Sequence, residues 1–176
     1  KPSEQVYIEE IGKVSDSRLQ AYMTRYGISG TPAEYRMQEY ARMVSRSPKE
    51  YGAVLNVKTG KVEIQKIGSK GKVENFVSDL VVPTMRKYMS GDEPFVANLF
   101  HTHPPYLDKT PRGSTHPSDR FQSVGKTGGD LAFMKNVEDH YNQGSFRPHL
   151  YSIGSSSGVT YFEPATDLRG VPSISK

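Results

Sequence analysis

The chain has 176 residues, with 23 basic and 19 acidic side chains and a formal net charge of +4. A chain of this length fits one domain and can bury a sizeable core. Cysteine is absent, which excludes disulfides and thiolate ligands, so any zinc would have to be held by histidine and carboxylate side chains.

No apolar run reaches the length of a membrane span, and no signal-peptide pattern opens the chain. The chain begins at Lys1 rather than at a methionine. This start suggests a processed or excised piece of a longer protein.

Two helices are predicted in the N-terminal part, residues 1–46. The first covers residues 15–26, with Ser15 or Asp16 as its cap and Gly27 as its stop. The second starts at Thr31-Pro-Ala-Glu34, where a threonine cap, a proline in the first turn and a glutamate form a helix-start pattern, and it runs to about Ser45.

A β-hairpin is predicted over residues 51–67, around a turn at 58–60. Five lysines lie along this hairpin and the loop after it: Lys58, Lys61, Lys66, Lys70 and Lys72. Such a stripe could follow a phosphate backbone, but no base-stacking aromatic residues are interleaved with it. Lysines are also typical of a solvated sheet edge, and we favour this interpretation, which argues against nucleic acid as a partner.

The other predicted elements are a helix at 78–89 that Pro83 interrupts or delays, a strand at 95–103, a long loop at 105–126, a helix at 128–141, a second hairpin with strands at 148–153 and 159–162, and an irregular tail at 163–176. Strands and helices follow one another without regular βαβ alternation, which argues against a doubly wound sheet. We expect one mixed α/β domain over 1–176, with a central mixed β-sheet flanked by helices and its core part in 47–162.

The predicted strand at 95–103 ends in His101-Thr-His103-Pro104. Side chains alternate along a strand, so both histidines project from one face while Thr102 points away. Pro104 cannot donate to a ladder and ends the strand where the second imidazole emerges. Two imidazoles at the end of a buried strand make half of a zinc site, although a chance histidine pair near a strand end is the simpler alternative.

A third ligand would be needed, and Asp130 is the preferred candidate. On the helix it opens, Asp130 lies in line with Met134, Val137 and Tyr141, which form the apolar, inward face. An inward carboxylate is costly unless a cation, a hydrogen-bond network or a metal compensates it, although an aspartate also suits the first turn of any helix. Asp119, beside His116 in the long loop, is the rival ligand.

These residues in this order resemble the JAMM (MPN-plus) metalloprotease family. That family carries an upstream glutamate, a His-x-His-Pro element at a strand end and a Ser-x-x-Asp element at the next helix. The matching elements here are Glu50-x-Gly52 before an apolar strand, His101-x-His103-Pro104, and Thr127-x-x-Asp130. The resemblance covers roughly residues 50–141 and implies a JAMM/cytidine-deaminase-like architecture.

The resemblance also implies a mechanism. His101, His103 and Asp130 would hold Zn²⁺ and leave a fourth position for water, which the metal acidifies. Glu50 would accept the water proton and pass it to the leaving amine, and Thr127 would donate a hydrogen bond to the developing oxyanion. The reaction would be hydrolysis of a peptide or isopeptide bond, with a protein or peptide as substrate.

The chain departs from the family pattern at two points. Thr127 replaces the serine, which keeps the hydroxyl and adds a methyl group. The loop at 105–126 is an insertion, in which Tyr106, Arg112 and His116 would shape the substrate groove, unless His116 supports the metal ligands instead.

With a long loop before its last motif, the chain is similar to the JAB-type toxin domains at the C-termini of RHS and other polymorphic bacterial effectors. A start without methionine suits a C-terminal toxin cut from its carrier. The resemblance therefore implies secretion or delivery into a target cell, with an immunity protein as a further partner. Two other classes stay open: a metal-dependent nuclease-type toxin, and a catalytically silent JAMM-like binding module, against which the presence of both histidines argues.

Overall fold

One β-sheet with helices on both faces organises the chain. The structure is a computed structural model that describes residues 11–68, 73, 75–103, 130–155 and 158–163, without the side chains of 130–132 and 149. The described strands are β1 (Tyr51–Asn56), β2 (Val62–Ile67), β3 (Phe95–Thr102), β4 (Phe146–Ser155) and β5 (Gly158–Phe162). They form a five-stranded sheet in the order β2-β1-β3-β4-β5.

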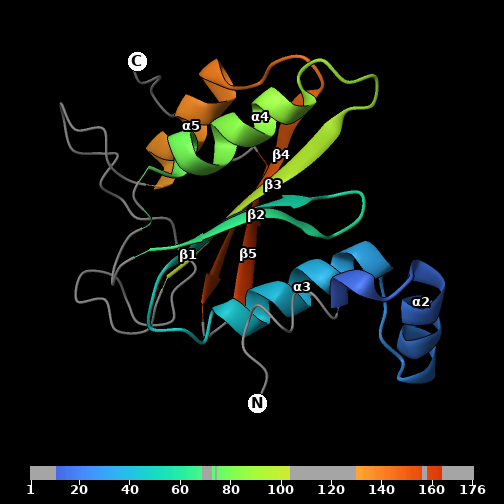
Figure 1. Cartoon of the computed structure of the whole chain (residues 1–176). Helices are drawn as coiled ribbons and strands as arrows, with labels where there is room; N and C mark the ends of the chain where they lie inside the picture. Colours follow the sequence, from blue (N-terminus) through green and yellow to red (C-terminus); the bar gives the residue numbers. More distant parts are fainter. Residues whose placement is uncertain (1–10, 69–72, 74, 104–129, 156–157, 164–176) are drawn as a thin grey trace.

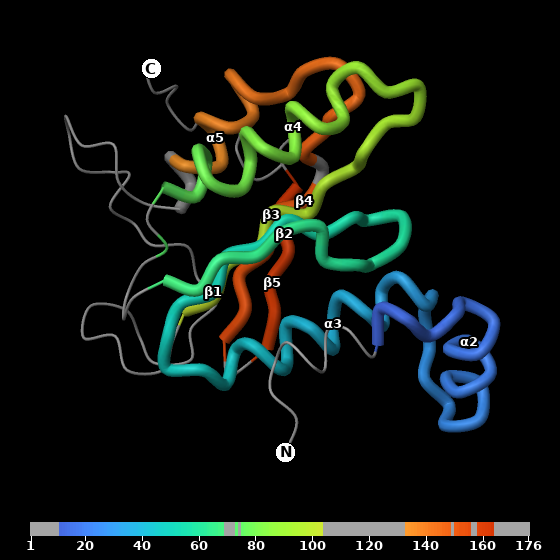
Figure 2. The backbone as a smooth tube through the Cα atoms, in the orientation of Figure 1, coloured from blue at the N-terminus to red at the C-terminus, as the bar shows by residue number. Residues whose placement is uncertain are grey.

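The described helices are α2 (Asp16–Arg25), α3 (Pro32–Val44), the π-helical turn η1 (Val77–Val81), α4 (Val82–Tyr88) and α5 (Asp130–His140). Figures 1 and 2 show α3 on one face of the sheet and α4 and α5 on the other. This arrangement confirms the predicted mixed α/β class, with a central mixed sheet flanked by helices. None of the helices in the described part of the chain has both the length and the apolar character that a membrane span requires.

The two N-terminal helices begin where their caps predict. The Ser15 hydroxyl accepts a hydrogen bond from the backbone N–H of Arg18, and Gly27, just after α2, has a φ of 66° that favours glycine. At α3, Thr31 and Glu34 form a reciprocal capping box. Since these contacts are local in sequence, the sequence pattern located both helices well.

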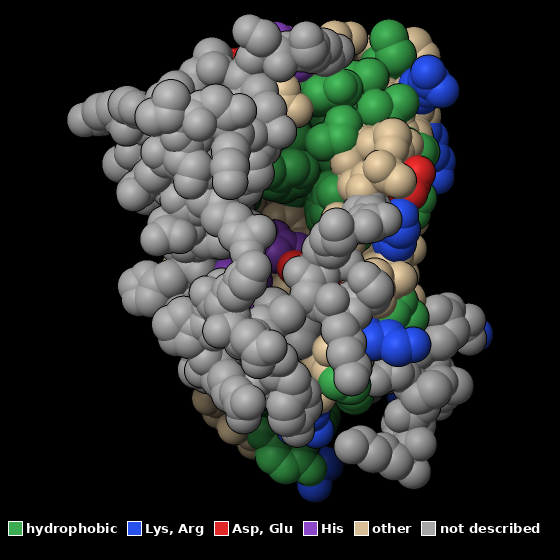
Figure 3. All heavy atoms as spheres, turned by 90° about the vertical axis from the view of Figure 1, so that its left-hand side faces the viewer, with side chains coloured by type: hydrophobic (Ala, Val, Ile, Leu, Met, Phe, Trp, Pro, Cys, Tyr) green, Lys and Arg blue, Asp and Glu red, His purple; other side chains and the backbone are tan. Residues whose placement is uncertain are grey.

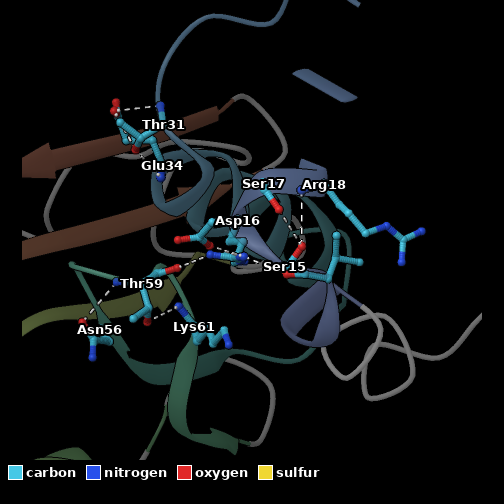
Figure 4. A network of polar contacts seen from close by, with 11 residues as sticks. Ser15, Asp16, Ser17, Arg18, Thr31, Glu34, Asn56, Thr59 and Lys61 are labelled. Carbon is cyan, nitrogen blue, oxygen red and sulfur yellow. Dashed lines mark hydrogen bonds and ion pairs between the residues drawn. The ribbon is translucent and has the colours of Figure 1, made fainter. Parts of the chain in front are cut away.

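A buried arginine connects α3 to its neighbours. The Arg36 guanidinium is 2% exposed, donates to the carbonyls of Thr59 (2.7 Å) and Val14 (2.9 Å), and pairs with the Asp16 carboxylate (2.6 Å). Figure 4 shows Asp16 and Thr59 at this network. Arg36 therefore fixes the start of α2 and the β1–β2 turn to the helix that covers the sheet.

β1 and β2 pair antiparallel, as predicted, and β2 is an edge of the described sheet. Lys58 and Lys61 are exposed in the turn, and Lys66 forms an ion pair with Asp79. The structure thus places the described lysines of this hairpin at a sheet edge, while Lys70 and Lys72 lie outside the described residues.

β3 lies at the centre of the sheet and sets its mixed character. It pairs antiparallel with β1 and parallel with β4, because the chain crosses over through α5 between β3 and β4. β4 starts earlier than predicted and includes Pro148, which lies where the β3–β4 register shifts. The β4–β5 hairpin is antiparallel, as expected.

The alternation of side chains along β1 and β3 produces two cores. One core lies between the sheet and α3, and includes Leu55 and Phe100. The other lies on the face covered by η1, α4 and α5, and includes Val54 and Leu99. The predicted loop at 105–126 and the tail beyond Glu163 lie outside the described residues.

Candidate metal centre

His101 and His103 lie together at the end of β3, on the same face, as the strand alternation predicts. Their side chains are 8% and 4% exposed, and their ring centroids are 5.2 Å apart with planes tilted by 57°. Leu99, two positions earlier, belongs to the core under η1, α4 and α5. The alternation of β3 therefore directs both imidazoles towards the face that carries α5.

A backbone hydrogen bond continues the pairing with β4 one residue beyond the end of β3. The N–H of His103 donates to the carbonyl of Gly154 on β4 at 2.8 Å, so the parallel ladder extends one residue past Thr102. The backbone that carries the second imidazole is thus held by the sheet. Figure 3 shows histidine side chains near the middle of the face that it presents, with aspartate or glutamate side-chain atoms next to them in that view.

Glu50 occupies the matching position at the start of β1. Gly52 pairs with His101 across the antiparallel β1–β3 ladder, so Glu50, two residues earlier, comes opposite His103 when that register continues. Val54 belongs to the same core as Leu99, and alternation along β1 places Glu50 on that face too.

The Glu50 side chain is only 8% exposed, so the simpler interpretation of this residue, an exposed carboxylate at a strand start, is wrong. The sequence left its burial undetermined because a single glutamate before a strand is common on protein surfaces. A buried carboxylate needs compensation from a cation, hydrogen bonds or a metal. Its burial beside two imidazoles supports a chemical role.

Thr102, between the two histidines, joins β3 to the residue after Glu50. Its hydroxyl accepts a hydrogen bond from the backbone N–H of Tyr51 at 2.9 Å, in a buried setting. Thr102 points towards the α3 face, away from the imidazoles, as predicted for the middle residue of His-x-His. Sequence reasoning gave this side chain no role; its hydroxyl on a core-facing position was the available signal.

We expect Thr102→Val to lower the free energy of unfolding by about 1–3 kcal/mol, because the buried Tyr51 N–H loses its acceptor while the side-chain volume is kept. Urea unfolding measures the difference. Thr102→Ser retains the hydroxyl and is the matched control, expected to lose less. If the valine variant is as stable as the parent, this hydrogen bond does not hold the start of β1.

Gly52 provides room for an aromatic side chain above the site face. A Cβ at Gly52 would lie 2.8 Å from the Phe76 ring, closer than packed atoms tolerate, and 3.1 Å from Val73, which is a tight contact. Phe76 in turn contacts Phe133 of α5, with ring centroids 5.0 Å apart in an edge arrangement. This chain of contacts links the first turns of α5 to the position opposite His101.

α5 presents the predicted apolar stripe to the core. Met134 and Val137 are buried, and Tyr141 packs against the same core. Asp130 begins the helix, as predicted, and helical geometry aligns it with that stripe. The Asp130 side chain lies outside the described part of the structure, as do Thr127, Asp119 and His116.

Glu138, two turns along α5, is a separate carboxylate of this face. It accepts a hydrogen bond from the Tyr151 hydroxyl of β4 at 3.2 Å. Burial raises the pKa of Glu138 above its usual value, and burial also raises the pKa of Tyr151. This hydrogen bond fixes α5 to β4.

Within the described side chains, no cluster of three or more histidine, cysteine, aspartate or glutamate residues forms a metal site. The structure brings together His101, His103 and the strand position of Glu50, and places the backbone of Asp130 at the start of α5. The side chains of both candidates for the third ligand, Asp130 and Asp119, lie outside the described residues.

Comparisons with protein-family models, with curated proteins and with solved structures found no match to this chain.

Proposed function

We propose that this domain is a zinc-dependent hydrolase of peptide or isopeptide bonds, of the JAMM type, and that it acts as the C-terminal toxin domain of a secreted bacterial protein. The observation that supports the hydrolase most directly is the buried pair His101 and His103, opposite the buried Glu50 across two adjacent strands. The toxin role depends on the resemblance in sequence alone.

The geometry of the imidazole pair fits a shared zinc ion. Two imidazoles bound to one tetrahedral zinc at about 2.1 Å have ring centroids roughly 5 Å apart. The observed separation of the His101 and His103 centroids is 5.2 Å. Packed rings in general lie about 4.5–7 Å apart, so the spacing is compatible with a shared zinc ion, and the two imidazole donors on one buried face suit that metal.

Asp130 is the proposed third ligand. The contacts from Phe133 to Phe76, and the place of Phe76 over Gly52, bring the N-terminal part of α5 towards the strand position opposite His101. A ligand at a helix start is also held more rigidly than one in a loop rich in proline and glycine. Both arguments favour Asp130 over Asp119.

Bound zinc would supply a Lewis acid that lowers the pKa of a water molecule towards neutrality. Glu50 would take the proton of that water and deliver it to the leaving amine, which its position next to His103 suits. Thr127 is proposed to donate a hydrogen bond to the substrate oxygen as negative charge develops there. The surrounding core excludes water from the back of the site, because Leu99 and Val54 lie directly behind it.

The test begins with metal analysis of the purified chain, where one zinc per molecule is expected. Three substrate arms follow in one buffer: unfolded casein, a synthetic peptide branched through a lysine side chain, and a plasmid mixed with total RNA. The proposal expects peptide-bond cleavage that a chelator blocks and added zinc restores. Cleavage of the nucleic acids alone would indicate a nuclease, and bound zinc without any cleavage would indicate a silent binding module.

Asp130→Asn and Asp119→Asn separate the two candidates for the third ligand. We expect Asp130→Asn to lower zinc affinity by more than about 10²-fold, because removal of a direct ligand should exceed the 10–100-fold effect of residues behind the ligands. Asp119→Asn should bind zinc as the parent does. Competition with a zinc-selective dye measures both, and the reverse outcome would place the ligand in the loop.

A further inference from the structure

α2 presents a face of tyrosine and arginine side chains to solvent. Arg18, Tyr22 and Arg25 lie at i, i+4 and i+7 on α2, and Tyr26 follows at i+8 as its C-cap, which keeps the four within an arc of about 100°. All four are exposed; Tyr22 is 46% exposed and Tyr26 60%. We refer to these four residues as the α2 face.

The rings of the α2 face are already ordered by one another. The Tyr22 ring lies 4.8 Å from the Tyr26 ring and 6.0 Å from the ring of Tyr35 on α3. The Arg25 guanidinium lies over the Tyr26 ring at 5.5 Å. A partner that binds here would immobilise few side chains, which lowers the entropic cost of association.

Tyr22 contacts α3 through the edge of the Tyr35 ring, but both tyrosines of the α2 face stay exposed. The helix is anchored by Leu19 and Met23, which are buried on the adjoining side. Figures 1 and 2 show α2 projecting beyond the sheet at the end of α3. Two large exposed aromatic side chains at such a place are typical of a surface that binds another molecule.

The charge of the α2 face has one sign. The aspartate of the helix, Asp16, lies on another side and pairs with Arg36. Figure 4 shows the Arg18 side chain extending away from that network. In the described part of the chain neither Arg18 nor Arg25 forms an ion pair with a carboxylate, so both charges are open to a partner.

We propose that the α2 face binds an acidic segment of a partner protein. Guanidinium groups match carboxylates with two parallel hydrogen bonds, and tyrosine and arginine are enriched where protein interfaces concentrate their binding energy. A nucleic-acid strand would need open ring faces for stacking, whereas Arg25 covers Tyr26. A membrane would need exposed aliphatic side chains, whereas Leu19 and Met23 are buried.

Selection from a displayed library of random twelve-residue peptides on the whole chain tests this proposal independently of the hydrolase. Enriched peptides should carry more aspartate and glutamate than lysine and arginine, together with an apolar anchor. Synthetic copies then give dissociation constants by fluorescence anisotropy. The affinity should fall as sodium chloride is raised, because exposed charges are screened.

Substitutions in the α2 face test whether the selected peptides bind there. Arg18→Glu combined with Arg25→Gln should weaken the selected peptides by about tenfold or more, and Tyr26→Ala should also weaken them, since interface arginines and tyrosines often cost over 1 kcal/mol when removed. Lys58→Glu combined with Arg86→Gln makes the same change in net charge at other exposed positions and should leave affinity unchanged. Circular dichroism checks that α2 remains helical in each variant.

Three results would overturn the proposal: no enrichment of peptides, enriched peptides without excess acidic residues, or acidic peptides that bind the arginine variant as tightly as the parent. Parallel measurements use a single-stranded RNA oligonucleotide and anionic phosphatidylserine vesicles. Binding of either that depends on the α2 face, without peptide binding, would assign the face to that class of partner instead.

Discussion

His101→Ala and His103→Ala should each yield a folded protein that purifies without stoichiometric zinc. Each substitution removes one of the two imidazoles whose rings lie 5.2 Å apart at the end of β3. An open zinc site has three protein ligands, and two are too few to hold the ion against water and buffer. We expect affinity to fall by well over about 10²-fold, beyond the effect of changing a residue behind the ligands.

Elemental analysis and dye competition measure the zinc, and a matched substitution controls for nonspecific loss. His140→Ala removes a half-buried histidine at the end of α5, away from the β3 terminus, and should leave zinc content unchanged. Thermal unfolding of metal-free samples shows whether the β3 variants still fold. Full zinc content in either folded β3 variant would rule out the proposed centre.

The elements that sequence predicted best are those fixed by local contacts. The capping box of Thr31 and Glu34, and the positive φ of Gly27 and Gly60, depend on neighbours within a few residues. The helix expected at 78–89 shows the limit of such patterns. It begins as the π-helical turn η1, and α4 then starts at Val82 with Pro83 in its first turn, so Pro83 delays the α-helix as anticipated.

Hairpin pairings were predicted, but pairing between strands far apart in the chain could not be predicted from these patterns. The parallel pairing of β3 with β4 joins residues about fifty positions apart, such as Leu99 and Tyr151. Alternation along a strand states which residues share a face, but not which strand comes next to it. The early start of β4, through Pro148, depends likewise on the register shift against β3.

In the candidate site, too, the sequence predicts what depends on local alternation and does not predict what depends on tertiary structure. His-x-His at a strand end predicted a shared face from the chain alone, and the structure confirms it. The burial of Glu50 depends on the register between β1 and β3, which brings a residue about fifty positions earlier in the chain beside the second histidine. The choice between Asp130 and Asp119 depends on tertiary placement too, and it stays a prediction.

Glu50→Gln should separate an enzyme from a structural metal site. Glutamine keeps the size and shape of the side chain but cannot accept a proton at neutral pH. If Glu50 is the general base, zinc content should stay at the parent level, while hydrolysis falls by about 10²- to 10⁴-fold, the usual contribution of a positioned acid–base group. Toxicity in a target cell, if the domain is an effector, should be lost with it.

Glu63→Gln is the matched control for this experiment, because it makes the same chemical change on the neighbouring strand β2. Glu63 is held by Lys87 at 2.9 Å and by the Tyr88 hydroxyl at 2.6 Å, so its substitution should affect stability and leave the hydrolytic rate unchanged. Initial rates on the cleaved substrate, at equal zinc occupancy, give the comparison. A Glu50→Gln protein that cleaves at the parent rate would exclude Glu50 from the mechanism, and a loss of rate confined to Glu63→Gln would transfer the role of base to β2. Loss of zinc from Glu50→Gln would instead identify Glu50 as a ligand, because a buried carboxylate beside His103 could bind the ion directly.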